Sequence, residues 1–285
     1  MCILEEKSML LGVIAALSAV VAVAVCAATG SFAGLTWLWV CPVSFLASFL
    51  AGVALVFLVL WVSCLCVDLN KPQEKESKYF RFVVKVLPKP ILTILLARVH
   101  TRGLENTPRD GRFLLVCNHL NDLDPVVLLG YFPDSQLSFI TKRENMSMFI
   151  VGKVMHKLLC QPVNRENDRE ALKTILNCIQ LVKNDQASIA VFPEGYTSRD
   201  GLLHHFRSGV FKIAQKTKIP IVVCTVQNTN KVFKNFAKLK PTDIHLHLLK
   251  VVQPEEYEGL TTVELGQRIH QLMADDLGPD MVAEV

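Results

Sequence analysis

The first part of this chain is most informative for the charge that it lacks. From Ser8 to Val67 there is no Asp, Glu, Lys, Arg or His. A membrane-spanning helix needs roughly 20 apolar residues, so this stretch is long enough for two. We predict spans at Leu10–Ala28 and Pro42–Val62, with a turn at residues 29–31. A stretch of this length without charge excludes an ordinary soluble domain for the N-terminal part.

A cleaved signal peptide is the competing interpretation of this start. Signal peptides begin with a positive segment, followed by a single short apolar core. Here Glu5 and Glu6 stand beside Lys7, and the apolar region is far longer than such a core. We therefore favour a retained transmembrane hairpin of two spans.

Basic residues gather directly after the apolar stretch. They are Lys71, Lys75, Lys78, Arg81, Lys85 and Lys89. Because flanking Lys and Arg residues stay on the cytoplasmic side, we expect an integral membrane protein whose remaining chain lies in the cytoplasm. The formal net charge is only +4. Its concentration beside the predicted membrane favours anionic lipid headgroups over nucleic acid as the partner.

The sequence also lacks the motifs of several kinds of site. The nine cysteines include no C-x-x-C pair, and the adjacent His204 and His205 have no third ligand at a metal-site spacing, so no metal is predicted. No G-x-S-x-G motif occurs, which removes the usual signature of a serine nucleophile. We interpret the cysteines as small buried side chains of a protein in a reducing compartment.

The rest of the chain predicts an α/β fold. Apolar runs predict strands at 113–117, 137–140, 188–192, 219–226 and 244–248, and helical periodicity predicts helices at 125–130, 169–183, 209–216 and 261–276. Strands that alternate with helices indicate a mixed sheet flanked by helices. We predict a transmembrane hairpin at 1–72, an amphipathic interfacial segment at 73–100 and a domain at 101–285. Pro88 and Pro90 divide the basic and apolar segment 78–98 into two short helices, which lie in the interface or pack on the domain.

A histidine follows the first predicted strand of the domain. His119 precedes Asp124 by five residues, and loops beyond strand ends hold the ligands of α/β folds. A carboxylate on one ring nitrogen orients an imidazole and stabilises its charged form after the other nitrogen takes a proton. We favour Asp124 over Asp122 as the partner because Pro125 after it predicts a helix start with Asp124 as N-cap, but the residues leave the choice open. A histidine base without a protein nucleophile indicates activation of a substrate hydroxyl.

A second corner follows a later strand, at Phe192-Pro193-Glu194-Gly195. Glu194 is suited to accept a hydrogen bond from a polyol hydroxyl, and Gly195 lets the backbone approach a ligand. An ordinary strand-to-helix turn is the alternative. The cations that a phosphate group requires occur in the same part of the chain: Lys142, Arg143, Arg165, Arg199, Arg207 and Lys212.

Together these residues resemble the glycerolipid acyltransferase family, in particular the lysophosphatidate (1-acyl-glycerol-3-phosphate) acyltransferases. Asn118, His119 and Asp124 match the family motif N-H-x-x-x-x-D, and residues 192–195 match F-P-E-G. Two further blocks of the family are similar to Val163-Asn164-Arg165 and Ile219-Pro220-Ile221-Val222. The resemblance covers about residues 101–226, and the four blocks occur in the order of the family.

The resemblance implies transfer of a fatty acyl group from a thioester to the free hydroxyl of lysophosphatidate, which gives phosphatidic acid. The donor is acyl-coenzyme A or acyl carrier protein, used as a co-substrate, and no other cofactor is implied. His119 becomes the general base and Asp124 its orienting partner. Lys142 or a backbone amide near Gly195 would steady the oxyanion. The implied substrate-binding residues are Lys142, Arg165, Glu194, Gly195 and Arg199.

Two departures from the family pattern bear on the acceptor. The family often continues F-P-E-G with Thr-Arg, whereas this chain has Tyr196-Thr197, and Asn164 replaces the usual aspartate of the second block. Since the missing arginine is expected to hold phosphate, the acceptor is alternatively another lysolipid, with Arg199 or Arg207 as the substitute. A non-catalytic lipid-binding protein and a membrane-bound hydrolase are the remaining alternatives.

Overall fold

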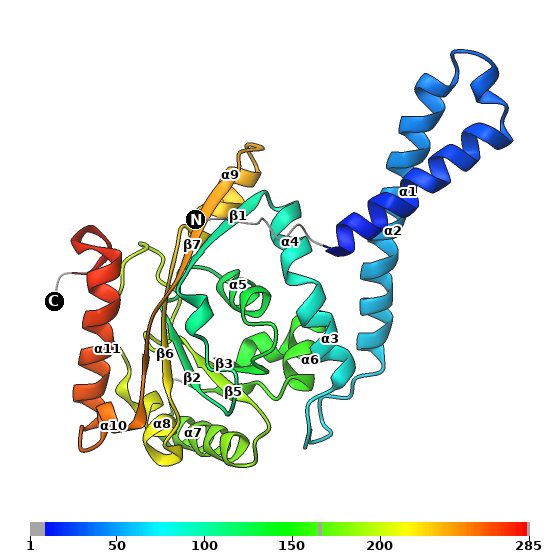
Figure 1. The fold of residues 1–285 in the computed structure, drawn as a ribbon. Coiled ribbons are helices and arrows are strands. Elements are labelled where there is room, and N and C mark those ends of the chain that lie inside the picture. The colour runs from blue at the N-terminus through cyan, green and yellow to red at the C-terminus, as the bar shows by residue number, and fades with distance from the viewer. Residues whose placement is uncertain (1–8, 165–166, 284–285) are drawn as a thin grey trace. The chain divides into compact units, whose positions relative to one another are not determined.

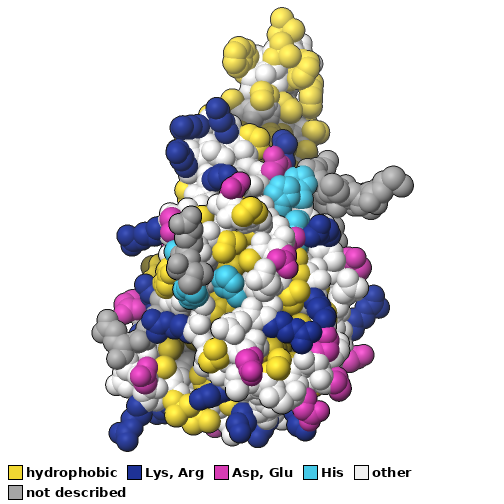
Figure 2. Space-filling model, turned by 90° about the vertical axis from the view of Figure 1, so that its left-hand side faces the viewer, with side chains coloured by type: hydrophobic (Ala, Val, Ile, Leu, Met, Phe, Trp, Pro, Cys, Tyr) yellow, Lys and Arg dark blue, Asp and Glu magenta, His cyan; other side chains and the backbone are white. Residues whose placement is uncertain are grey.

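The computed structural model describes residues 9–164 and 167–283, and the chain divides into two compact units, residues 1–68 and 69–285. The first unit is a hairpin of α1 (Met9–Ala28) and α2 (Trp37–Leu65), joined through a 3-10 turn at Ser31–Ala33 (Figure 1). Both helices are long and apolar enough to cross a membrane. Hydrophobic side chains cover the face of this unit that Figure 2 shows.

The two predicted spans are confirmed as helices, but the second begins at Trp37, before Pro42. The proline lies in the second turn of α2, where its fixed φ and missing N–H cost less than they would deeper in the helix. The two helices pack closely, because a Cβ on Gly52 would stand 2.9 Å from Cγ2 of Ile14. A small residue at a helix crossing is typical of helix pairs in membranes.

The second unit contains a seven-stranded sheet in the order β1-β7-β6-β2-β5-β3-β4. Neighbouring strands are parallel, except that β7 runs antiparallel to β6. This arrangement confirms the predicted α/β class with a mixed sheet. The strands are β1 (Ala97–Arg102), β2 (Leu114–Cys117), β3 (Leu137–Lys142), β4 (Gln161–Val163), β5 (Ser188–Val191), β6 (Ile221–Gln227) and β7 (Thr242–Val252).

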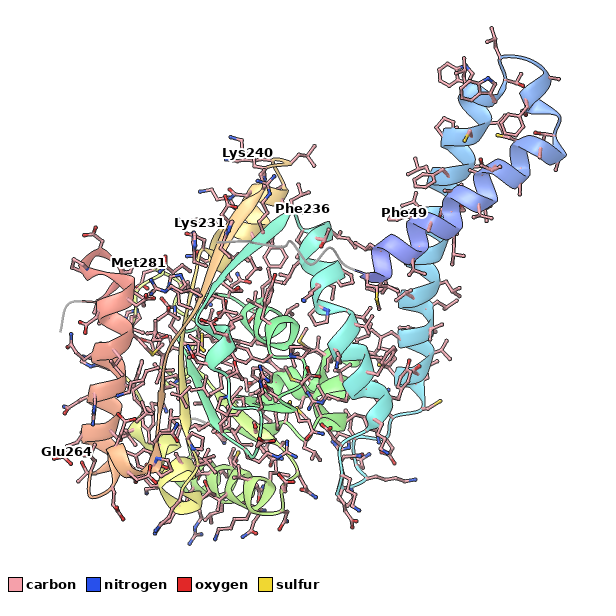
Figure 3. The ribbon with its side chains drawn as sticks, in the orientation of Figure 1. Phe49, Lys231, Phe236, Lys240, Glu264 and Met281 are labelled. Carbon is pink, nitrogen blue, oxygen red and sulfur yellow. The ribbon has the colours of Figure 1, made fainter. Side chains whose placement is uncertain are left out.

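Helices cover both faces of the sheet (Figure 1). The core cluster joins one face to α7, α8 and α11 through buried residues such as Ile179, Ile213 and Ile269. In Figure 3, Glu264 and Met281 mark the two ends of the α11 region. The helices are α3 (Lys78–Val86), α4 (Pro88–Ile94), α5 (Asp124–Tyr131), α6 (Phe149–Lys157), α7 (Asp168–Lys183), α8 (Lys212–Thr217), α9 (Val232–Phe236), α10 (Pro254–Tyr257) and α11 (Thr262–Leu277).

The two short basic helices α3 and α4 pack on this unit. Phe80 and Val84 of α3 and Leu92 of α4 are buried, whereas Phe82 remains on the outer face of α3. Arg81 forms an ion pair with Glu76 at 2.7 Å and donates to the carbonyl oxygen of Leu137 at 3.0 Å, which fixes α3 against β3. Packing on the domain is therefore the observed alternative for most of segment 78–98. The sheet itself starts inside the predicted interfacial segment, because β1 begins at Ala97.

The position of the site follows from the sheet order. The fully buried β2 lies between β5 and β6 and is parallel to both, so the carboxyl ends of the three strands meet at one edge. Each strand is followed there by polar residues: Asn118 and His119 after β2, Glu194 after β5, and Thr229 after β6. Ligands bind at this edge in open α/β sheets.

Candidate active site

His119 and Asp124 are joined by a direct hydrogen bond. Nδ1 of His119 lies 2.8 Å from Oδ2 of Asp124, whose side chain is fully buried. The same oxygen accepts from the backbone N–H groups of Leu120 at 2.7 Å and Asn121 at 2.8 Å. The other carboxylate oxygen accepts from the hydroxyl of Thr229 at 2.5 Å. Four donors thus fix the carboxylate, and Asp124 is the observed partner of the histidine.

The predicted N-cap role of Asp124 is wrong. The N-cap of α5 is Leu123, and Asp124 is the first helical residue. Its carboxylate turns back to the amides of the preceding loop rather than forward to the helix. This turn is what lets a residue five positions later reach the imidazole. Asp122 lines the neighbouring pocket instead.

The second ring nitrogen of His119 faces a hydroxyl. A carboxylate only accepts, so Nδ1 carries the proton and Nε2 is the acceptor. Oγ1 of Thr197 lies 3.0 Å from Nε2. The ring also stacks on Phe192, with centroids 4.2 Å apart and planes at 17°. Asp124 therefore holds the imidazole at Nδ1 and Phe192 holds it at the ring face, while Nε2 accepts a hydrogen bond from the hydroxyl of Thr197.

Glu194 connects two loops beneath this histidine. Its oxygens accept the backbone N–H groups of His119 at 2.9 Å and of His204 at 3.1 Å, and the residue is 1% exposed. It does not line the pocket described below. Asn118 makes a similar connection, because its side chain exchanges two hydrogen bonds with the backbone of Val226 at 2.8 and 2.9 Å. Both residues hold the backbone of the histidine loop in place.

Burial raises the pKa of Glu194 from 4.5 to about 7, against the opposing effect of its two backbone donors. A carboxyl that binds its proton more tightly when folded stabilises the fold at low pH, and this contribution disappears as the pH rises from about 4.5 to about 7. It is of order 3 kcal/mol. A glutamine does not titrate, so only the unsubstituted protein loses this contribution as the pH rises. We therefore expect the difference between the Tm of Glu194→Gln and that of the unsubstituted protein to shift in favour of the variant between pH 4.5 and about pH 7. Thermal unfolding of both proteins at several pH values tests this, and parallel Tm curves would contradict it.

A pocket of about 1200 Å³ opens beside the histidine. One wall is apolar and comes from β3, α6 and α7; it includes Phe139, Ile140, Met148, Val151, Met155 and Ile175. The lining also includes His119, Thr197 and three residues of the FPEG corner, Phe192, Pro193 and Gly195. The cations in its lining are Lys142, Arg199 and Arg207. The acidic residues in the lining are Asp122, Asp168 and Asp200. The pocket therefore combines apolar side chains with charged side chains of both signs.

The structure distributes the sequence-predicted binding residues unevenly. Lys142, Gly195 and Arg199 line this pocket, whereas Arg165 lies outside the described residues. Gly195 has a φ of +81°, and a Cβ there would stand 2.9 Å from Cδ and Nε of Arg207. The glycine thus lets the arginine side chain cross the corner closely. The backbone N–H of Arg207 also donates to the carbonyl oxygen of Pro193 at 2.7 Å.

Sequence reasoning missed two hydroxyl groups of this site. Thr197 contacts the imidazole and Thr229 contacts its carboxylate partner. In the sequence, Thr197 stands out only because it occupies the position of the family's arginine, and Thr229 belongs to no recognisable motif. A polar residue directly after a buried strand, as Thr229 follows β6, was the available signal.

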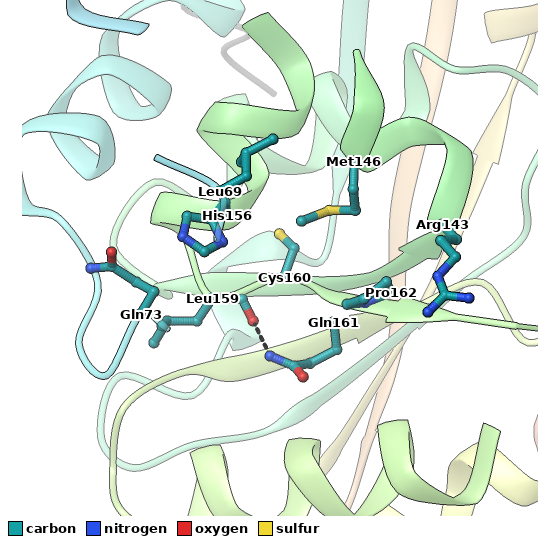
Figure 4. Close-up of a pocket in the computed structure, with 9 residues that line it drawn as sticks. All are labelled: Leu69, Gln73, Arg143, Met146, His156, Leu159, Cys160, Gln161 and Pro162. Carbon is teal, nitrogen blue, oxygen red and sulfur yellow. Dashed lines mark hydrogen bonds between the residues drawn. The ribbon is translucent and has the colours of Figure 1, made fainter. Parts of the chain in front are cut away.

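A smaller cavity of about 370 Å³ is lined by residues that include His156 of α6 and Gln161 and Pro162 of β4 (Figure 4). Its lining residues differ from those of the large pocket and include Arg143, Met146, His156 and Cys160. Burial raises the pKa of the Cys160 thiol to about 11, so this sulfur is an uncharged side chain. The cavity does not include His119, and Arg143 lines it rather than the large pocket.

Known proteins resemble this chain in sequence over its second unit. Residues 98–227 match the family model described as Acyltransferase. Over 158 residues the chain is 33% identical to the chloroplastic 1-acyl-sn-glycerol-3-phosphate acyltransferase BAT2 of Brassica napus, which covers 55% of this chain and 45% of that protein. It is 28% identical over 181 residues to the 1-acyl-sn-glycerol-3-phosphate acyltransferase of Borreliella burgdorferi, with 61% and 72% covered.

A solved structure has the same fold. The crystal structure of the 1-acyl-sn-glycerophosphate acyltransferase PlsC from Thermotoga maritima matches with a TM-score of 0.59 and 24% identity, over 70% of this chain and 79% of that one. The chain spans about half the length of the plant relatives that it matches. By its motifs, its sequence relatives and its fold, the chain resembles the glycerolipid acyltransferases, with residues 98–227 as the part that matches the acyltransferase family.

Proposed function

We propose that this protein transfers a fatty acyl group from a thioester donor to the free hydroxyl of lysophosphatidate, producing phosphatidic acid. The observation that carries the proposal is the position of the Thr197 hydroxyl, 3.0 Å from Nε2 of His119. An acceptor hydroxyl that replaces it lies where the imidazole can take its proton. The buried Asp124 on the other ring nitrogen supplies the compensating charge.

The proposed reaction is a direct transfer. Nε2 of His119 takes the proton of the acceptor hydroxyl while its oxygen bonds to the thioester carbonyl carbon, and the carbonyl electrons move onto the oxygen. As the carbonyl re-forms, the carbon–sulfur bond breaks and the thiolate leaves with the proton from the imidazolium. The Gly195 N–H donates to the carbonyl oxygen of Phe192 at 3.0 Å, which favours Lys142 as the group that steadies the oxyanion.

The two parts of the pocket suit the two parts of these substrates. The apolar wall fits a fatty acyl chain, and arginine side chains are good partners for a phosphate group. Arg199 and Arg207 line the pocket, and we assign to one of them the role of the arginine that Thr197 replaces. A neutral lysolipid acceptor would leave these cations unused, which is why we place lysophosphatidate first.

A lysolipid panel tests the acceptor. The purified full chain is assayed with lysophosphatidate and with an uncharged, phosphate-free lyso-glycolipid, using acyl-coenzyme A and acyl carrier protein as separate donors. We expect lysophosphatidate to react preferentially and Arg207→Met to raise its KM about tenfold or more, the loss of one charge-assisted contact. A preference for the neutral acceptor would instead favour the alternative lysolipid function. Release of free fatty acid without any acceptor would indicate a hydrolase, and no turnover a lipid-binding protein.

The apolar wall predicts control of chain length. Met155 of α6 lines it, and a tryptophan there would fill part of the compartment. We expect Met155→Trp to lower kcat/KM for long-chain donors about tenfold or more while short-chain donors react nearly as before, since steric overlap affects only chains that reach this depth. Competition between donors of different length measures this. An equal loss for all lengths would place the acyl chain elsewhere.

The proposal includes the membrane. Helices α1 and α2 would span the bilayer, and the basic residues after them would keep the catalytic unit in the cytoplasm. Both acceptor and product would then remain in the same bilayer as the enzyme. Protease accessibility of the catalytic unit in sealed, right-side-out vesicles tests this orientation. Cleavage by protease added outside the vesicles would place the catalytic unit on the opposite side of the membrane and contradict the proposal.

A further inference from the structure

A basic tip extends from the second unit between β6 and β7. It comprises residues 228–241, which include α9 and no Asp or Glu. Its four lysines are Lys231, Lys234, Lys238 and Lys240, all exposed. Figure 3 shows Lys231 and Lys240 reaching outward at this end of the domain, and Figure 2 shows Lys and Arg side chains gathered there. The tip is therefore a local concentration of positive charge.

Large apolar side chains are exposed among these lysines. Leu239 is 80% exposed and Phe233 is 51% exposed. The junction of α4 and β1 lies alongside, because the N–H of Thr242 donates to the carbonyl oxygen of Leu96 at 3.0 Å. Leu96 is 38% exposed and its neighbour Ile94 43%. Two segments that are far apart in sequence thus bring exposed apolar side chains and lysines to the same end of the sheet.

The backbone of this patch is constrained. Leu96 and Leu239 have φ values of +55° and +53°, a left-handed conformation that favours glycine. Two hydrogen bonds hold the tip in place. The N–H of Lys240 donates to the carbonyl oxygen of Asn235 at 3.0 Å, and the side-chain amide of Asn235 donates to the hydroxyl of Thr242 at 2.9 Å. Burial does not explain a leucine at either position. Strained residues that persist without a packing reason indicate a function for the side chain.

We propose that residues 228–241, together with the α4–β1 junction, form a docking surface for an anionic lipid bilayer. The exposed leucines and phenylalanine would enter the interfacial region while the lysines contact headgroup phosphates. Asp243, at the base of the tip, forms a hydrogen bond with His100 at 2.9 Å and stands outside the lysine-bearing segment 228–241.

The docking surface also bears on the histidine site. Thr229, at the start of the tip, donates to Asp124, and the tip continues from the carboxyl end of β6. Docking would turn the edge of the sheet that carries the pocket toward the bilayer. The proposal needs no particular chemistry at the site, so it is tested without an activity assay.

Hydrogen–deuterium exchange on the full chain provides the test. The protein is reconstituted into nanodiscs of phosphatidylcholine alone or of phosphatidylcholine with phosphatidylglycerol. We expect amide exchange in residues 231–240 to slow about fivefold or more in the anionic discs only. Lys234→Glu with Lys238→Glu should remove this protection, and Leu239→Ser should weaken it. Lys212→Glu with Lys216→Glu, in α8 beyond the opposite end of β6, is the matched control and should retain it.

The outcomes separate the explanations. Equal exchange of the tip in both kinds of disc would overturn the proposal, as would equal loss of protection in the α8 control, which would indicate attraction of the whole domain. Protection of the tip by an acidic acyl carrier protein, but not by anionic discs, would assign the surface to a protein partner and also overturn it. Unchanged exchange in α11 shows that each variant is folded.

Discussion

Replacing His119 with alanine should slow acyl transfer about 10²–10⁴-fold, the usual contribution of a general base. The reason is geometric. Nε2 is the ring nitrogen that faces an alcohol in this site, and its partner nitrogen is already fixed by Asp124. Without the imidazole the acceptor hydroxyl must lose its proton to water during attack. Initial rates of the reconstituted enzyme with saturating donor and acceptor measure the loss.

The His119 variant needs a test of folding and a matched histidine. The substitution removes the ring stack on Phe192, but Asp124 keeps its three other donors. We therefore expect the variant to remain folded, as circular dichroism would show. His205→Ala, at an exposed histidine outside the pocket lining, should leave the rate nearly unchanged. Turnover of the His119 variant within a few-fold of the unsubstituted enzyme would rule out the assigned base.

The Asp124→Asn variant should be about 10²–10³-fold slower while keeping its fold, because it removes a charge and few hydrogen bonds. Its amide oxygen can replace Oδ2 and accept from His119, Leu120 and Asn121. Its NH₂ group then faces the Thr229 hydroxyl, which can accept as well as donate. The free energy of unfolding should change by only about 1 kcal/mol. What is lost is the negative charge that stabilises the imidazolium.

Thr229→Val is the control for this interpretation. It removes one donor to Asp124 and leaves the carboxylate charge in place. We expect only a modest loss of rate from it, measured in the same assay. If Thr229→Val and Asp124→Asn were equally slow, the position of the carboxylate rather than its charge would be decisive. Near-normal turnover of Asp124→Asn would remove the carboxylate from the mechanism.

Local chemistry made several parts of the site predictable. The order of residues placed His119 in the loop after a buried strand and Asp124, before a proline, at the start of α5. The choice between Asp122 and Asp124 was not settled locally, because it depends on where the loop amides point. Glu194 illustrates the same limit. Its residue type suited a substrate contact, but the packed loops supply two backbone donors and bury it.

Elements with strong local patterns were predicted closely, and edge elements were not. The helix expected at 169–183 is α7, with the Asn167 side chain accepting from Arg169 and Glu170. By contrast, β1, β4 and α6 were missed. The strand β1 has weak alternation and pairs with β7, a partner more than a hundred residues later in the chain. Pairing at that separation leaves no local signature.

The sequence by itself determined the apolar hairpin, the α/β class and the identity of the histidine, because these depend on hydropathy, periodicity and residue type along the chain. Only the tertiary structure decided which aspartate meets the imidazole, that Thr197 and Thr229 complete the hydrogen bonds, and that Glu194 supports the loops. The physical reason is the sheet order, which brings the ends of β2, β5 and β6 together from distant parts of the chain. Contacts between those ends depend on packing that no single segment encodes.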